Sequence, residues 1–91
     1  MIKYIIIGKK WLDKVNGNTY NSARIFDLEK KVIAVAPFQY GYGDYFIQAA
    51  IEALQKAGKF DGIMLKHDEY ITIDCGYVKQ RDVKWWGKYN F

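Results

Sequence analysis

Runs and alternations of apolar residues predict three strands in the first part of the chain. The unbroken run Ile5-Ile6-Ile7 predicts a strand over residues 2–8 that is buried on both faces. Residues 19–27 alternate, and this places four side chains on one face of a second strand: Tyr20, Ser22, Arg24 and Phe26. Residues 31–36 predict a third strand that ends at Pro37, because proline has no N–H for the ladder.

One amphipathic helix is expected next. Asp44 is a suitable N-cap, and Gly58 can adopt the left-handed conformation that ends a helix. Between them, helical spacing predicts a buried stripe made of Ile47, Ala50, Ile51, Leu54 and Ala57.

The pattern weakens after this helix. Phe60, Ile63, Met64 and Leu65 fit a short strand or a packed connection. Residues 69–75 alternate and predict a strand that points Ile71, Ile73 and Cys75 inward. From Tyr77 onward no clear period is visible. The order β-β-β-α-β predicts a single α+β domain, an antiparallel sheet with one helix packed on one face.

The segment between the first two strands, residues 8–24, is expected to form a long loop that leads into the second strand. A turn signal, Asn16-Gly17-Asn18, lies inside it. Such a loop is a candidate binding surface. Its cations could neutralise phosphates, its two rings could stack on bases, and its asparagines could contact base or sugar edges. The candidate residues are Lys9, Lys10, Trp11, Lys14, Asn16, Asn18, Tyr20, Asn21 and Arg24. Alternatively, Trp11 fills a small core, the asparagines shape the turn and the lysines are solvated.

The net charge of +4 is distributed unevenly. Residues 1–24 and 79–91 are basic, whereas the middle of the chain is acidic. The basic tail also contributes candidates for nucleic-acid binding: Lys84, Trp85 and Lys88. If the two basic ends meet in space, they form one basic face. The alternatives are that both are ordinary solvated surfaces, and that the two tail tryptophans serve packing or self-association.

A glycine-rich aromatic segment precedes the helix, and it offers a second candidate site. Tyr40, Tyr42, Gly43 and Tyr45 could contact a small ligand such as a nucleotide. The spacing matches neither the dinucleotide fingerprint nor the P-loop, and Asp44 would repel an anion. Simple packing of the rings is the other interpretation.

The sequence contains no recognisable catalytic or metal-binding pattern. His67-Asp68-Glu69 is the only cluster with a histidine, and it is interpreted as a charged turn. We therefore expect no enzyme activity, no cofactor and no metal. The single cysteine, Cys75, excludes an intramolecular disulfide, fits a reducing cytoplasm and is expected to be a buried thiol. Neither a signal peptide nor a membrane span is visible.

Two blocks carry a resemblance to a known group of proteins. The strings KKWLDKVNGNTYNS at residues 9–22 and PFQYGYGD at residues 37–44 resemble a family of small uncharacterised bacteriophage and prophage proteins. The resemblance implies a small accessory protein in a bacterial host cytoplasm, and it transfers no residue role. Three strands followed by a helix are also similar in order to small DNA-binding domains of some integrases and plant transcription factors. In those domains the sheet lies in the major groove.

These observations favour an accessory protein that binds nucleic acid through a basic, aromatic loop and strand. A protein-interaction module that inhibits a host or defence protein, with self-association, is the first alternative. A binder of a small nucleotide is the second.

Overall fold

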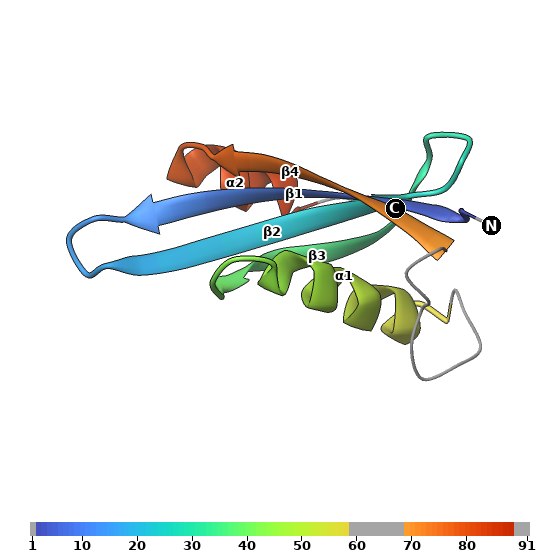
Figure 1. Cartoon of the computed structure of the whole chain (residues 1–91), viewed down its shortest axis with the longest axis horizontal. Helices are drawn as coiled ribbons and strands as arrows, with labels where there is room; N and C mark the ends of the chain where they lie inside the picture. Colours follow the sequence, from blue (N-terminus) through green and yellow to red (C-terminus); the bar gives the residue numbers. More distant parts are fainter. Residues whose placement is uncertain (1, 59–68, 89–91) are drawn as a thin grey trace.

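In the part of the chain that the structure describes, four strands form one mixed sheet with a helix on each face (Figure 1). The computed structural model describes residues 2–58 and 69–88. The elements are β1 (Tyr4–Asp13), β2 (Asn18–Phe26), β3 (Val32–Tyr40), α1 (Tyr45–Lys56), β4 (Tyr70–Tyr77) and α2 (Gln80–Trp86). The strand order is β3-β2-β1-β4. The predicted α+β class is confirmed, but β4 lies parallel to β1, and α2 is a second helix that the sequence pattern did not predict.

The first two strands form a long hairpin, so the expected loop over residues 8–24 is wrong. β1 continues to Asp13 and β2 begins at Asn18, which leaves a short turn. Gly17 has a φ of 69°, and its N–H donates to the Asp13 carbonyl at 2.8 Å. Lys9 and Lys10 do not interrupt β1, because each side chain has a partner on its own face of the sheet: the Trp86 ring and Asp74, respectively.

The core lies between α1 and one face of the sheet, here called the α1 face. Ile6, Ala23, Ile25, Ala34 and Ala36 pack against Phe46, Ala49, Ala50 and Leu54 of the helix. The small strand residues let the helix approach closely. A Cβ at Gly8 would clash with the Phe46 ring, so this glycine makes room for the phenylalanine.

The helical stripe is rotated from its predicted position. Phe46 and Ala49 are buried, whereas Ile47 and Ile51 are only partly buried and Ala57 is exposed. Gly58 has a φ of 68° just after the helix, which confirms the predicted stop. Asp44 precedes the helix as predicted, but its side chain makes no capping hydrogen bond.

Pro37 lies within β3 and does not end it. The β2–β3 pairing shifts between Asn21 opposite Gln39 and Ala23 opposite Ala36, so β3 contains an extra residue there. A bulge on an edge strand is a position where proline costs no ladder hydrogen bond. Beyond this bulge β3 continues to Tyr40, which pairs with Tyr20.

The inward and outward faces of β4 are the reverse of the prediction. Tyr70 pairs with Tyr4 and packs against the core, which places Ile71, Ile73 and Cys75 on the other face. Ile71 and Ile73 are 48% and 46% exposed, and Cys75 is exposed as well, so the expected buried thiol is wrong. The expectation that β1 is buried on both faces is also wrong, because only Ile6 of its isoleucines is fully buried.

Several expectations fall on residues outside the described ranges. These are the packed connection at residues 60–65, the turn at His67 and Asp68, and the end of the tail at residues 89–91. Neither helix in the described part of the chain has the length and apolar character that crossing a membrane requires.

Candidate nucleic-acid interface

A row of aromatic side chains crosses three strands at the hairpin end of the sheet. Trp11 of β1 stacks on Tyr20 of β2 with ring centroids 5.6 Å apart, and Tyr20 stacks on Phe38 of β3 at 5.1 Å. Tyr40 meets Tyr20 edge to face at 5.8 Å, and Tyr42 meets Tyr40 in the same way at 5.2 Å. We call these five residues the aromatic row. Cross-strand aromatic pairs of this kind stabilise a sheet locally.

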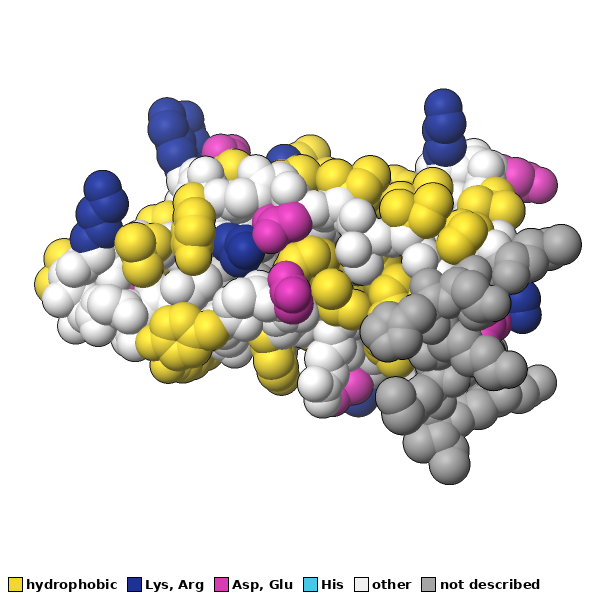
Figure 2. Space-filling model, viewed as in Figure 1, with side chains coloured by type: hydrophobic (Ala, Val, Ile, Leu, Met, Phe, Trp, Pro, Cys, Tyr) yellow, Lys and Arg dark blue, Asp and Glu magenta, His cyan; other side chains and the backbone are white. Residues whose placement is uncertain are grey.

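Helix α2 lies on the same face as the row, and it brings the basic tail to the basic first segment. We call this the α2 face. Lys9 Nζ lies 4.6 Å from the centre of the Trp86 ring, and Lys84 Nζ lies 5.4 Å from the centre of Phe38. Lys14 is exposed at the hairpin turn and Lys79 beside it, whereas the exposed Lys88 lies next to Arg24, toward the middle of the sheet. Figure 2, which views the molecule from the side of α1, shows Lys and Arg side chains projecting from the hairpin end.

Arg24 anchors α2, and it is not a free phosphate ligand. Its guanidinium lies over the Trp85 and Trp86 rings, 4.5 and 4.3 Å from their centres. Nε donates to the Trp86 carbonyl at 3.0 Å, and Nη2 donates to the carbonyls of Trp85 and Lys88 at 3.3 and 3.1 Å. The residue is 8% exposed. It therefore satisfies the carbonyls that end the helix. The phosphate-binding role that the sequence analysis gave to Arg24 is wrong for this reason.

Two further contacts fix α2 on the sheet. Ser22 Oγ donates to the Val83 carbonyl at 2.6 Å, and Val83 is fully buried. Trp86 Nε1 donates to the Ile7 carbonyl of β1 at 2.7 Å. Trp86 is thus the tail tryptophan that packs, while Trp85 is 59% exposed. Of the two, Trp85 is the ring that a ligand can reach.

Lys10 and Asn21 lie on the α1 face, away from the other candidates. Lys10 Nζ is 2.7 Å from Asp74 Oδ2, and the lysine is 8% exposed. Burial raises the pKa of Asp74, but hydrogen bonds from Lys10 and from the Gly76 N–H outweigh it and hold the pKa below 3.8. Asn21 is fully buried and donates from Nδ2 to the Gly41 carbonyl at 3.1 Å. Neither residue can therefore contact a nucleic acid that lies on the same surface as Trp11.

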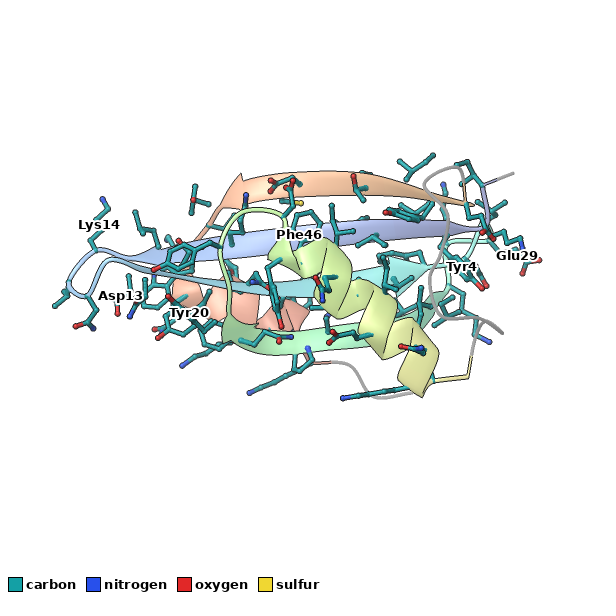
Figure 3. The ribbon with its side chains drawn as sticks, turned by 60° about the horizontal axis from the view of Figure 1, so that its bottom comes forward. Tyr4, Asp13, Lys14, Tyr20, Glu29 and Phe46 are labelled. Atoms are coloured by element: carbon teal, nitrogen blue, oxygen red, sulfur yellow. The ribbon has the colours of Figure 1, made fainter. Side chains whose placement is uncertain are left out.

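The asparagines of the turn shape the hairpin. Asn16 Nδ2 donates to Asp13 Oδ2 at 2.9 Å, and Asn18 Oδ1 accepts from Tyr42 Oη at 3.4 Å. The hydrogen bond from Asn16 is the main cause of the lowered pKa of Asp13. Figure 3 places Asp13 and Lys14 at the tip of the hairpin, at the opposite end of the sheet from Tyr4 and Glu29. The cation at this tip thus projects from a turn held by its own side chains.

The tyrosine-glycine segment is tied to the hairpin. Tyr42 Oη lies within hydrogen-bonding distance of the Gly17 carbonyl, at 3.3 Å. Interaction with the Tyr42 hydroxyl raises the pKa of Tyr40. Gly43 has a φ of 56° in the bend before α1, and Tyr45 packs against the core. Tyr40 and Tyr42 therefore extend the aromatic row, whereas Tyr45 packs against the core.

Two of the pockets on the described surface lie away from this segment. One, of about 520 Å³, opens where β4 ends beside β1, and it is lined by Trp11, Leu12, Lys14, Tyr77, Val78 and Lys79. Sequence reasoning missed Tyr77 and Lys79, because the parallel pairing that brings them to β1 leaves no local signal. The other, of about 640 Å³, lies between β3 and α1, and it includes Ala34, Pro37, Ala49 and Lys56.

No group of three or more His, Cys, Asp or Glu residues that could hold a metal occurs within residues 2–58 and 69–88. Comparison with protein-family models, curated proteins and solved structures finds no match to this chain. The resemblance to phage proteins therefore stays a prediction.

Proposed function

We propose that this protein binds single-stranded nucleic acid along the α2 face, from the hairpin turn to the region of Arg24. The observation that carries the proposal is that the two basic segments of the chain meet there around the aromatic row. Lys9 and Lys84 lie over rings of this surface, and Lys14 and Lys88 are exposed. Cations grouped around rings can hold the phosphates of a strand whose bases contact the rings.

The charge balance of this surface supports an anionic ligand. Asp13 and Asp82 are the acidic residues of the segments 9–24 and 79–88. The oxygens of Asp13 already accept hydrogen bonds from the turn. Lysines that lie over rings keep their charge at the surface, since the ring attracts the cation without neutralising it. A strand that approaches this surface is therefore attracted by an excess of positive charge.

The stacking geometry selects the rings that bases can reach. Tyr20 has one face against Trp11 and the other against Phe38, so the base-stacking role predicted for it is not available in this arrangement. Trp11 has a neighbour in the row on one face only, and Trp85 is largely exposed. We infer that bases stack on Trp11 and Trp85. An unpaired strand fits this arrangement better than a duplex does, because its bases are free to leave their neighbours.

The integrase-like alternative, a sheet lying in the major groove, has less support. In that arrangement the face opposite the helix is the one that enters the groove. Here that face carries α2, whose Val83 and Trp86 are held to β2 and β1 by hydrogen bonds. A groove-bound sheet would have to displace this helix.

The test is binding of fluorescein-labelled 15-nucleotide dT and rU strands, measured by anisotropy at low and high salt. For single strands the slope of log affinity against log salt is about −0.7 per neutralised phosphate. The double substitution Lys84→Gln/Lys88→Gln should weaken binding and reduce the slope by about 1.4. A comparison of dT and rU then distinguishes DNA from RNA.

The matched control is Lys31→Gln/Lys56→Gln. It removes the same charge from two exposed lysines that lie outside the proposed surface. This control should leave affinity and slope almost unchanged. Absence of binding at 50 mM salt, or an equal effect of both double variants, would contradict the proposed surface.

We propose a protein-interaction module as the second candidate, because apolar side chains of β4 are uncovered on the α2 face. Ile71 and Ile73 are nearly half exposed beside the half-buried Ile5 and Ile7. Such a surface suits a second copy of the chain or a host protein that an accessory phage protein would inhibit. A dimer in light scattering that Ile71→Lys/Ile73→Lys converts to a monomer supports self-association. A monomeric wild type with no nuclease-resistant partner in host lysate contradicts both versions.

A further inference from the structure

β4 lies at one edge of the sheet, and most of its side chains are uncovered on both faces (Figure 1). Helices α1 and α2 pack mainly against β1, β2 and β3. Residues 71–75 are exposed in succession, although isoleucine, threonine and tyrosine give residues 70–73 a strong preference for strand structure. The one charge in this stretch, Asp74, is paired with Lys10. An exposed edge strand of this composition is a template for pairing with another strand.

The outer edge of β4 presents backbone donors and acceptors. The Lys10 carbonyl accepts a hydrogen bond at 2.7 Å from the residue that follows β4, so Lys10 directs its backbone groups toward β4. Orientation alternates along a strand, and Ile6 and Gly8 therefore point the same way. In a parallel pair, such a residue bonds to the two neighbours of the residue opposite it, whose own groups point away. Thr72 and Asp74, opposite Ile6 and Gly8, thus direct their N–H and C=O groups to the free edge.

The two edges of the sheet differ in how they are protected. At the β3 edge, Pro37 lies in a bulge, and a second shift of register occurs near the start of the strand. Proline and bulges both oppose further pairing at an edge. Over Tyr70–Asp74, β4 pairs regularly with β1, and its register shifts only after Asp74. There the Gly76 N–H donates to Asp74 Oδ1 at 2.7 Å, so the regular free edge is limited to residues 70–74.

This five-residue edge is complementary to itself in an antiparallel arrangement. With a twofold axis at Thr72, the outward groups of Thr72 in two copies face each other, and Ile71 of each copy lies opposite Ile73 of the other. Ile71 and Ile73 are 48% and 46% exposed, so these pairs would cover apolar surface. Asp74 would lie opposite Tyr70. An axis at Asp74 would oppose two carboxylates, which is destabilising, and an axis at Ile73 would carry the pairing into the bulge.

We propose that two copies of this chain pair through their β4 edges, antiparallel and centred on Thr72, to join their sheets into one. The inference rests on the self-association proposed above as the second candidate function. It names the edge of β4, and not its open face, as the contact. Pairing of five residues a copy makes a small interface, so a weak and concentration-dependent dimer is expected.

The first experiment is sedimentation of the full chain between about 5 and 500 µM, the range of a small, transient interface. The wild type should shift from monomer toward dimer. Thr72→Pro removes an outward N–H and no bond to β1, so it should hold the protein monomeric without unfolding it. The matched control Thr72→Val keeps the N–H and should dimerise like the wild type. Circular dichroism checks that both variants are folded.

The outcomes separate edge pairing from other forms of self-association. A dimer that survives Thr72→Pro but is lost in Ile71→Lys/Ile73→Lys packs face to face, which overturns edge pairing and leaves the second candidate function standing. A wild type that stays monomeric over the whole range overturns self-association in both forms. Loss of the dimer in Thr72→Pro, together with its retention in Thr72→Val, supports the edge.

A disulfide tests the register and does not depend on the folding of the proline variant. In a Cys75→Ser background, Thr72→Cys places two thiols across the twofold axis, with Cα atoms about 5.5 Å apart, within the range of a disulfide. Mild oxidation should give a covalent dimer. In the wild type, each Cys75 would lie about 20 Å from its counterpart and should stay unlinked. Absence of the Thr72→Cys cross-link, or equal cross-linking through Cys75, would overturn the proposal.

Discussion

The two faces of the sheet differ in the kind of residue that each buries. The α1 face is built from small aliphatic strand residues under Phe46, and its one buried lysine, among the residues described, is paired with Asp74. The α2 face buries Val83 and the stem of Arg24, and it leaves rings and lysines at its surface. The α1 face thus closes the fold, whereas the α2 face combines attachment of a helix with an accessible cationic surface.

The difference between the faces arises from the second strand. Ala23 and Ile25 of β2 point to the α1 face, and Tyr20, Ser22 and Arg24 point to the α2 face. One nine-residue strand therefore supplies a hydrophobic core on one side and polar anchors on the other. Substitutions on the two sides should have separable consequences for stability and binding.

The largest effect is expected on the α1 face. Phe46→Ala should lower the free energy of unfolding by about 3–5 kcal/mol, because it leaves a cavity over Gly8 in the tightest part of the core. Tyr20→Leu on the α2 face should lower it by about 1 kcal/mol, the loss of ring contacts in a half-exposed row. Denaturant unfolding followed by circular dichroism measures both. Equal losses would show that the α1 face is not the main core.

Removal of the Arg24 anchor should have the next largest effect. Arg24→Met should lower the free energy of unfolding by about 2 kcal/mol, since three helix-terminal carbonyls lose a charged donor. Arg24→Lys keeps the charge but lacks the planar fork, so an intermediate loss is expected. Hydrogen exchange of the α2 amides should accelerate more than that of α1. Uniform acceleration of both helices would contradict a local role.

On the α2 face, exposed and enclosed rings should contribute differently to strand binding. Trp85→Leu should weaken binding of a 15-nucleotide strand about tenfold with little change in stability, because Trp85 is exposed. Tyr20→Leu should weaken it less, since both faces of that ring are occupied. Anisotropy titrations at one salt concentration compare the two variants. A larger loss of affinity in Tyr20→Leu than in Trp85→Leu would show that bases stack at the middle of the aromatic row.

Local patterns in the sequence predicted the faces of β2, the stop at Gly58 and the α+β class, because each depends on residues close in the chain. Long-range partners were not predictable in this way. Lys10 was interpreted as a surface cation because Asp74, its partner, is remote in the sequence. Arg24 was assigned to phosphate for the same reason, since its acceptors are the carbonyls of a helix that shows no clear period. Pairing between residues far apart in sequence also determines which face of β4 is buried, and local alternation therefore predicted the wrong face.

The smallest expected effect is the pH dependence of the ion pair on the α1 face. The pKa of Asp74 is lowered from 3.8 in the folded protein, so the folded state holds this proton less readily than the unfolded chain does. The pair therefore stabilises the fold fully above pH 3.8, and this contribution is lost as the pH falls through the folded pKa. Because Asp74 is 39% exposed, solvent screening limits the contribution to about 1 kcal/mol or less.

Thermal unfolding between acid and neutral pH should show the melting temperatures of the wild type and Asp74→Asn converging at low pH. A constant difference at every pH would assign the stabilisation to packing and not to charge.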